Sequence, residues 1–206
     1  MESQLNREHL ITRFYDRFIA YAGGISDFHE NKYAWLCGWS DKYNQYKRFE
    51  LLKNIGIVNK DSVLDIGCGG GEFVNYCSEN NIDIDYTGID INSYYIQLAK
   101  TLHPDLTFIK SDGSDLPDKK YDWAIASGIF TIETDIDYIL KYSEFVMDKL
   151  VVKGFAFNLL NKTAPSELIT YESMEILSAL QPRFPQYKTE IIEGYLYDDF
   201  TVYLTK

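Results

Sequence analysis

Four residues with a regular spacing give the strongest chemical signal in the sequence: Asp65, Gly67, Gly69 and Gly71. Asp65 belongs to a short apolar segment, 63–66, which is typical of a strand buried on both faces of a parallel sheet. Glycines let the backbone approach a ligand closely, and the start of the helix that can follow them presents free N–H groups to that ligand. The pattern therefore predicts a nucleotide-type binding turn between a strand and a helix.

The charge in this turn indicates which kind of ligand it suits. A dinucleotide fingerprint needs glycine at its first, third and sixth positions, but the sixth position counted from Gly67 is Glu72. Asp65 would also repel a pyrophosphate, whereas an ammonium or sulfonium group would not be repelled. After about twenty more residues a second short strand ends at Asp90, where an acid can hold a ribose diol. These features disfavour a nicotinamide dehydrogenase.

Two further segments continue the same order along the chain. Asp112 lies in the segment 108–113, and the segment 121–128 reads as another buried strand followed by a small Ser-Gly pair. Together with the glycine turn and Asp90, these motifs resemble those of the class I S-adenosylmethionine-dependent methyltransferases, over roughly residues 63–130. The resemblance implies a Rossmann-like fold and S-adenosylmethionine as cofactor. No metal is expected, because the residues form no metal cluster.

The resemblance also implies a role for the residues of the first two motifs. Gly67 and Gly69 would let the backbone pass under the methionine and ribose portions of the cofactor, with Gly71 completing the turn. Asp65 would hold the amino end, and Asp90 would accept hydrogen bonds from both ribose hydroxyls. The alternative for Asp90 is a simple helix cap.

For the adenine end and the acceptor side, the resemblance implies further cofactor contacts. Asp112 would accept a hydrogen bond from the adenine amino group, Gly113 or Ser114 would offer a backbone N–H to the ring, and Ile91 and Leu116 could lie on its two faces. Ser127 and Gly128 would line the junction where the acceptor meets the sulfonium. The assignment of Asp112 is weaker because other acids share its loop.

Candidate substrate and catalytic residues lie mainly outside these motifs. Arg48 and Gln45 are one turn apart on an expected helix and could point into the cleft together, although Arg48 could instead form a surface ion pair. The aromatic residues Tyr43 and Phe130 are candidate pocket walls, with ordinary packing as the alternative. The candidate general bases are His29 and Glu133. The acids near Glu133 look like helix-start residues rather than a metal cluster.

The composition limits the partners. The 206 residues carry 20 basic and 31 acidic side chains, so the net charge of −11 opposes a nucleic-acid backbone as the main partner. The three cysteines lack metal-site spacing, and no stretch has the roughly 18 apolar residues of a membrane span. A cytoplasmic protein without a membrane or nucleic-acid partner is expected.

Strand and helix patterns alternate after residue 62, which predicts an α/β fold with a doubly wound, mostly parallel seven-stranded sheet and a C-terminal antiparallel hairpin. We expect one domain, 1–206, made of an N-terminal helical cap region (1–58) and a Rossmann-like core (59–206). The predicted strands are 62–66, 85–89, 106–109, 121–126, 151–158, 187–192 and 201–205. The predicted helices are 4–22, 42–54, 71–80, 92–102, 134–149 and 166–180, the last capped by Ser166 after Pro165.

The sequence favours methylation of a small molecule, with the oxygen of a sugar or metabolite as the preferred acceptor. Amino-directed nucleic-acid methylases carry an Asn/Asp-Pro-Pro-aromatic tetrapeptide after the fourth strand, and the segment 127–130 departs from it. The alternatives are a protein or nucleic-acid methyltransferase and a non-catalytic S-adenosylmethionine-binding subunit. The oligomeric state is left open.

Overall fold

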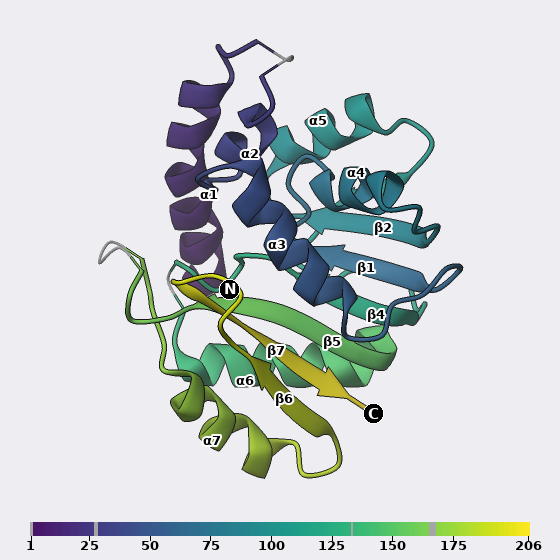
Figure 1. Ribbon diagram of the computed structural model, residues 1–206, viewed down its shortest axis with the longest axis vertical. Helices are drawn as coiled ribbons and strands as arrows, with labels where there is room; N and C mark the ends of the chain where they lie inside the picture. Colours follow the sequence, from purple (N-terminus) through teal and green to yellow (C-terminus); the bar gives the residue numbers. More distant parts are fainter. Residues whose placement is uncertain (1, 27–28, 133, 165–167) are drawn as a thin grey trace.

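The computed structural model describes residues 2–26, 29–132, 134–164 and 168–206, without the side chains of residues 2–7. Figure 1 shows a central sheet with helices on both sides. The helical elements are α1 (Glu2–Ala22), α2 (Lys32–Leu36), α3 (Lys42–Lys53), α4 (Glu72–Glu79), α5 (Ser93–Leu102), α6 (Ile136–Phe145), the π-helical turn η1 (Val146–Leu150) and α7 (Ser173–Arg183). The strands are β1 (Ser62–Ile66), β2 (Asp85–Asp90), β3 (Thr107–Lys110), β4 (Tyr121–Ala126), β5 (Val151–Leu160), β6 (Lys188–Ile192) and β7 (Asp199–Thr205).

The sheet has seven strands in the order β3-β2-β1-β4-β5-β7-β6. Strands β1 to β5 pair in parallel, and β7 pairs antiparallel with both β5 and β6. The chain winds outward from β1 in one direction and then resumes at β4 on the other side. The predicted fold class, including the antiparallel hairpin at the C-terminus, is confirmed.

The strand segments show little alternation of apolar and polar residues because both faces of the sheet are buried. Val63 and Leu64 are adjacent in β1, and both are fully buried although they face opposite sides of the sheet. On one face α3, α4 and α5 pack over the sheet, with Phe49 and Phe73 in contact at 5.4 Å between ring centroids. On the other face α6, η1 and α7 form a second core. Both cores hold the strand ends in fixed positions.

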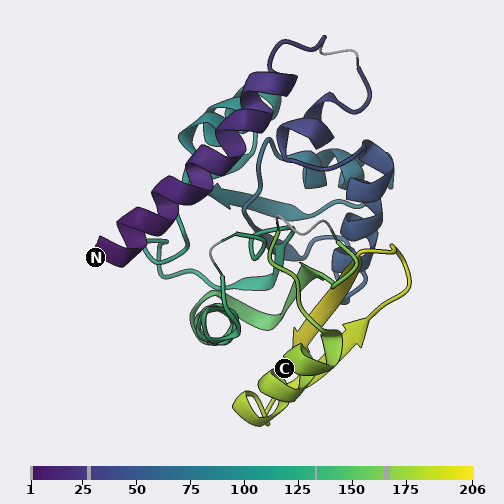
Figure 2. The same ribbon diagram turned by 90° about the vertical axis from the view of Figure 1, so that its left-hand side faces the viewer.

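Helix α1 lies along the edge where the parallel strands end (Figures 1 and 2). Ala22 of α1, Leu36 of α2 and Tyr95 of α5 form a third, smaller buried cluster. The Tyr95 hydroxyl donates a hydrogen bond to the carbonyl of Leu36. The N-terminal helices are therefore fastened to the core through α5.

Three helices begin at a residue whose side chain caps them. Asp41 accepts a hydrogen bond from the Asn44 N–H at the start of α3, and Asn92 accepts one from Tyr94 at the start of α5. Asp135 does the same for α6. The sequence did not predict the five-residue helix α2.

The start of α7 differs from the prediction. The helix begins at Ser173 rather than near residue 166, and the predicted cap at 165–166 lies outside the described residues. The Tyr171 N–H donates to the Leu160 carbonyl at 2.8 Å, and Tyr171 forms a β-bridge with Asn161. This long-range pairing keeps the chain extended, and the pairing leaves no local signal in the sequence.

Candidate cofactor and acceptor site

The glycine turn after β1 is tied directly to β2. The N–H groups of Gly67 and Cys68 both donate to the Ile89 carbonyl, at 2.8 and 3.0 Å. Gly67 and Gly69 have φ values of +73° and +54°, which favour glycine. A Cβ at Gly67 would lie 2.4 Å from Ile129 Cγ2. The turn therefore needs glycine both for its backbone conformation and for the close packing of its neighbours.

Asp90 joins the end of β2 to this turn. One carboxylate oxygen accepts the Gly69 N–H at 3.0 Å, and the other accepts the Asn92 N–H at 2.8 Å. Burial raises the pKa of Asp90 to about 6, with the backbone N–H groups acting in the opposite direction. Each oxygen keeps a further acceptor direction, so the side chain can fix the turn and still bind hydroxyl groups.

Asp65 lies deeper, at the end of β1. Its carboxylate accepts a hydrogen bond from the Tyr86 hydroxyl at 2.8 Å, and only 4% of the residue is exposed. Burial raises the pKa of Asp65 to about 7; the Tyr86 bond opposes the rise and the nearby Asp90 charge adds to it. Within the described part of the chain, neither acid has a cation at ion-pair distance. A ligand with a positive group would supply the missing compensation.

The loop after β3 is organised around its own hydrogen bonds. Asp112 accepts from the N–H and the hydroxyl of Ser114, and the Asp112 carbonyl accepts from the Tyr142 hydroxyl at 2.8 Å. The Gly113 N–H donates to Ser111 Oγ at 2.8 Å. In this structure the N–H that Gly113 was expected to offer to the adenine ring is bonded to Ser111, and the N–H of the alternative donor, Ser114, is bonded to Asp112.

A pocket lies where the carboxyl ends of β1, β2 and β4 meet. The predicted cofactor residues that line it are Asp65, Gly67, Gly69, Asp90, Ile91, Asp112, Ser127 and Gly128. Gly71 and Gly113 do not line it. Gly71 caps α4 with a φ of +87°, and a Cβ there would meet the Phe108 ring at 3.1 Å. Its role is to start the helix.

Three polar atoms in the pocket wall have no hydrogen-bond partner among the described residues. They are Gln45 Oε1, Asn92 Nδ2 and Ser127 Oγ, and all three atoms are buried. A buried polar atom without a partner is costly unless a ligand or water satisfies it. Together with the uncompensated acids, these atoms fit a nucleoside that carries both hydroxyl groups and a positive charge.

The N-terminal helices supply pocket residues that the sequence did not identify. Ile11 and Tyr15 of α1, one turn apart, line the pocket, as do Cys37 and Trp39 after α2. Cys37 Sγ lies 2.7 Å from where a Cβ of Gly69 would be, and burial raises the pKa of this thiol to about 12. The one-turn spacing on α1 was a usable signal, but the approach of residues 37–39 to the glycine turn was not.

Several predicted substrate and catalytic residues lie away from the pocket. Phe130 is 1% exposed and packs edge-on against Phe157 in the core, so the expectation that it forms a pocket wall is corrected. Tyr43 is 67% exposed on α3 and does not line the pocket. His29 is exposed and lies against the Trp35 ring, and its Nδ1 accepts the Asn31 N–H at 3.2 Å. Glu133 lies outside the described residues.

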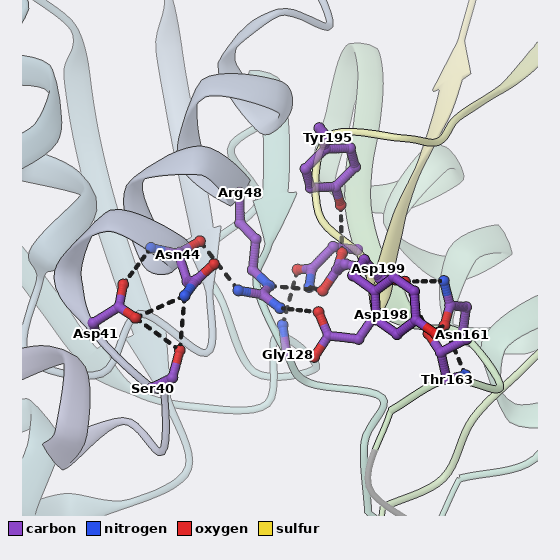
Figure 3. A network of polar contacts seen from close by, with 12 residues as sticks. Ser40, Asp41, Asn44, Arg48, Gly128, Asn161, Thr163, Tyr195, Asp198 and Asp199 are labelled. Atoms are coloured by element: carbon purple, nitrogen blue, oxygen red, sulfur yellow. Dashed lines mark hydrogen bonds and ion pairs between the residues drawn. The ribbon is translucent and has the colours of Figure 1, made fainter.

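Arg48 takes part in a buried network beside the pocket (Figure 3). Its Nε donates to Asp199 at 2.6 Å, and Asp198 lies 3.7 Å away. Asn158 donates to Asp199 at 3.2 Å and accepts the Gly128 N–H at 3.1 Å. The expected alternative of a surface ion pair is therefore corrected to a buried one that reaches the end of β4.

No group of three or more His, Cys, Asp or Glu side chains among the described residues is arranged to hold a metal ion. No helix in that part of the chain has the length and apolar character needed to cross a membrane.

Comparisons with known proteins agree with this geometry. A family model described as a methyltransferase domain matches residues 63–144. A Mycobacterium tuberculosis protein described as a methyltransferase is 30% identical over 120 residues, which cover 53% of this chain and 69% of the relative. A similar description applies to a protein of Invertebrate iridescent virus 6, 36% identical over 86 residues, 41% of this chain. The chain matches only 32% of the length of that viral relative.

Two further comparisons concern proteins with named substrates. The fatty-acid O-methyltransferase of Mycolicibacterium smegmatis is 33% identical over 90 residues, which cover 40% of this chain and 32% of the relative. The magnesium protoporphyrin IX methyltransferase of Synechocystis, crystallised with bound S-adenosylmethionine, superimposes with a TM-score of 0.63 at 16% identity. That match covers 100% of this chain and 97% of the other. The chain belongs to the class I S-adenosylmethionine-dependent methyltransferases, the family whose cofactor is S-adenosylmethionine.

Proposed function

We propose that this chain transfers the methyl group of S-adenosylmethionine to an oxygen atom of a small molecule. The observation that carries the proposal is the cover over the pocket. Tyr15 of α1 and the residues Cys37 and Trp39 line the pocket together with the strand-end residues, so segments that precede β1 in the sequence close part of the site. A covered site of this kind suits a small acceptor better than a folded protein or a nucleic-acid strand.

The cofactor would be held by the acids at the strand ends. Asp90 would accept hydrogen bonds from the ribose hydroxyls, and Asp65 would face the positively charged methionine end. Asn92 Nδ2, which lacks a partner among the described residues, would donate to the nucleoside. Bound S-adenosylmethionine supplies a methyl group that is already activated by the sulfonium charge.

The chain's own contribution to the transfer would be alignment and exclusion of water. Ser127 Oγ and Gln45 Oε1 are buried hydrogen-bonding atoms in the pocket wall, and either could orient an acceptor hydroxyl. Holding acceptor and donor in line removes much of the entropic barrier, and a dry pocket strengthens the electrostatic contacts. The similarity to an enzyme named for O-methylation of fatty acids supports oxygen as the acceptor atom, but the match covers only 40% of this chain and does not extend to the acid as the acceptor class.

The test uses methyl-deuterated S-adenosylmethionine, the purified chain and a metabolite extract of the native host. We expect a small molecule in the extract to gain the deuterated methyl group by mass spectrometry, and no gain with the Asp90→Ala variant. Label in protein or RNA of an unfractionated lysate, with none in the metabolites, would contradict the small-molecule proposal. No transfer to any fraction would favour the non-catalytic subunit.

A further inference from the structure

A second cavity of about 250 Å³ adjoins the cofactor pocket. The two share Tyr15, Cys37, Trp39, Gly128 and Thr131 in their walls. Tyr15 comes from α1, Cys37 and Trp39 follow α2, and Gly128 and Thr131 follow β4 close to Ser127, which lines the cofactor pocket. The second cavity therefore borders the cofactor pocket near this junction.

The walls of the second cavity are largely apolar and aromatic. Phe14 and Phe18 come from α1, Leu160 from the end of β5, and Leu168 from the segment that follows β5. Trp39 lies between the two cavities, with its ring 2.9 Å from where a Cβ of Gly128 would be. These side chains offer a surface for a flat or aliphatic body of small-molecule size.

The charges around this cavity balance. Its two cations are Arg17 and Arg48, and the facing acids are Asp198 in the wall and Asp199 directly behind it. Arg48 is buried with 4% of its side chain exposed, and it is already bound to Asp199 and near Asp198 (Figure 3). The Arg17 guanidinium lies at the exposed rim, 4.0 Å from the centroid of the Phe14 ring.

A carboxylate in this cavity would therefore lack a buried cation of its own. It would also stand beside Asp198, which lines the cavity. Burying an unpaired anion is strongly unfavourable, and a contact with Arg17 at the solvent-exposed rim would repay little of that cost. A neutral hydroxyl group avoids the penalty and can bond to the hydroxyl of Ser127 or the amide of Gln45.

We propose that the second cavity is the acceptor site and that it takes a neutral, largely apolar alcohol or phenol in preference to a carboxylic acid. The inference rests on the proposed methyl transfer and names the substrate class of that site. The body of the acceptor lies between α1 and the end of β5, and its hydroxyl reaches past Trp39 and Gly128 to the sulfonium side. In the transfer, the acceptor oxygen forms the new bond to the methyl carbon as the bond from that carbon to sulfur breaks. The hydroxyl proton leaves to solvent, and S-adenosylhomocysteine is released.

The experiment measures binding of matched probe pairs to the full chain saturated with S-adenosylhomocysteine, by ligand-observed NMR at neutral pH. The pairs are benzyl alcohol with benzoate, cinnamyl alcohol with cinnamate, and octanol with octanoate. We expect at least one alcohol to bind, and to bind at least about tenfold more tightly than its acid. Acids that bind as tightly as the alcohols, or alcohols that show no saturable binding, would overturn the proposal.

Three variants test whether the alcohol probes bind in the second cavity. Leu168→Glu places a charge in the cavity wall and should weaken binding of the alcohol at least about tenfold. Phe18→Ala removes a ring from the opposite wall and should change the order of preference among the three alcohols. Met174→Glu, a matched change at an exposed position on α7, should have no effect. Equal alcohol binding by Leu168→Glu and the unmodified chain would show that the probe binds elsewhere.

Binding of S-adenosylhomocysteine distinguishes a failure of this inference from a failure of the proposed function. Unchanged binding of S-adenosylhomocysteine by all three variants, together with lost alcohol binding in Leu168→Glu, supports the acceptor site. If S-adenosylhomocysteine does not bind the unmodified chain, the proposed function fails, and the inference fails with it. If S-adenosylhomocysteine binds but the alcohols do not, the inference alone fails.

Discussion

Two groups of buried acids lie at the same edge of the sheet, and they differ in their partners. Asp65 and Asp90, at the ends of β1 and β2, accept hydrogen bonds only from neutral donors in the described structure. Asp199, at the start of β7, is bound to the Arg48 guanidinium, and Asn158 and Tyr195 also donate to it. Burial raises the pKa of the carboxyl in all three cases, to about 7 for Asp65 and about 6 for the other two.

The difference separates a binding role from a structural one. A buried acid that already has its cation contributes to holding the fold, and removal of the cation leaves an uncompensated charge. A buried acid without a cation destabilises the empty protein, and a cationic ligand can relieve that cost. We therefore propose that Asp65 and Asp90 serve the ligand, whereas Asp199 holds the structure around the site.

The largest expected effect concerns the structural group. Replacement of Arg48 with methionine should lower the free energy of unfolding by about 3–5 kcal/mol, because the Asp199 carboxylate loses its cation while still buried. Urea denaturation measures the change. Lys47→Met is the matched control, since Lys47 pairs with Glu50 at the surface and such pairs contribute about 0–1 kcal/mol.

The double variant Arg48→Met with Asp199→Asn should recover a large part of that loss, because no charge is then left buried. A double variant as unstable as Arg48→Met alone would show that packing around the guanidinium, such as its contact with the Trp39 ring, matters more than the charge.

The next largest effect concerns the ligand group. Asp90→Ala should abolish the stabilisation by S-adenosylhomocysteine, which is about 2.7 kcal/mol when the ligand is present at 100 times its dissociation constant. Thermal unfolding with and without the ligand measures this. Asp83→Ala, at an exposed position on the loop before β2, should keep the full shift. An unchanged shift in Asp90→Ala would assign the ribose contact to another residue.

A smaller effect tests the missing cation directly. The Asp65 carboxyl has a pKa near 7 in the folded protein and an ordinary value near 3.8 when unfolded, so the folded state holds its proton more tightly. The contribution of Asp65 to the stability of the empty protein should therefore fall as the pH rises from about 4 to about 7. Asp65→Asn should remove part of this slope and be more stable than the unmodified chain by about 2 kcal/mol at about pH 8.

Urea denaturation at both ends of this pH range supplies the measurement. The full cost of ionisation is not recovered, because the new amide N–H group in the variant lacks an acceptor. If stability changed with pH to the same extent in both proteins, burial would not raise the pKa of Asp65 in the folded state. The Asp65→Asn variant should keep the part of the pH dependence of stability that comes from Asp90.

The smallest effect lies at the start of the helix that carries Arg48. Asp41→Ala removes the side-chain acceptor of the Asn44 N–H and should lower stability by about 1 kcal/mol. S-adenosylhomocysteine affinity, measured by isothermal titration, should stay the same because Asp41 lies outside the cofactor pocket. A weaker affinity would show that the cofactor site depends on the exact position of α3.

The sequence by itself determined the sheet, the glycine turn and the acids at the ends of β1 and β2. Those features depend on short-range rules: apolar runs form buried strands, glycine permits positive φ, and a residue at the end of one parallel strand lies beside the end of the next. The same rules placed Asp112 and Ser127 in the pocket wall.

Only the tertiary structure decided the partner of Arg48, the cover over the pocket and the start of α7. Arg48 and Asp199 are 151 residues apart, and they meet because β7 inserts beside β5 under α3. By its position in the sequence, Phe130 was as good a candidate for the pocket wall as Ser127. In the structure it points into the core, where its ring packs against Phe157. Contacts between distant segments depend on how whole layers pack together, and that packing leaves no spacing in the sequence to identify them.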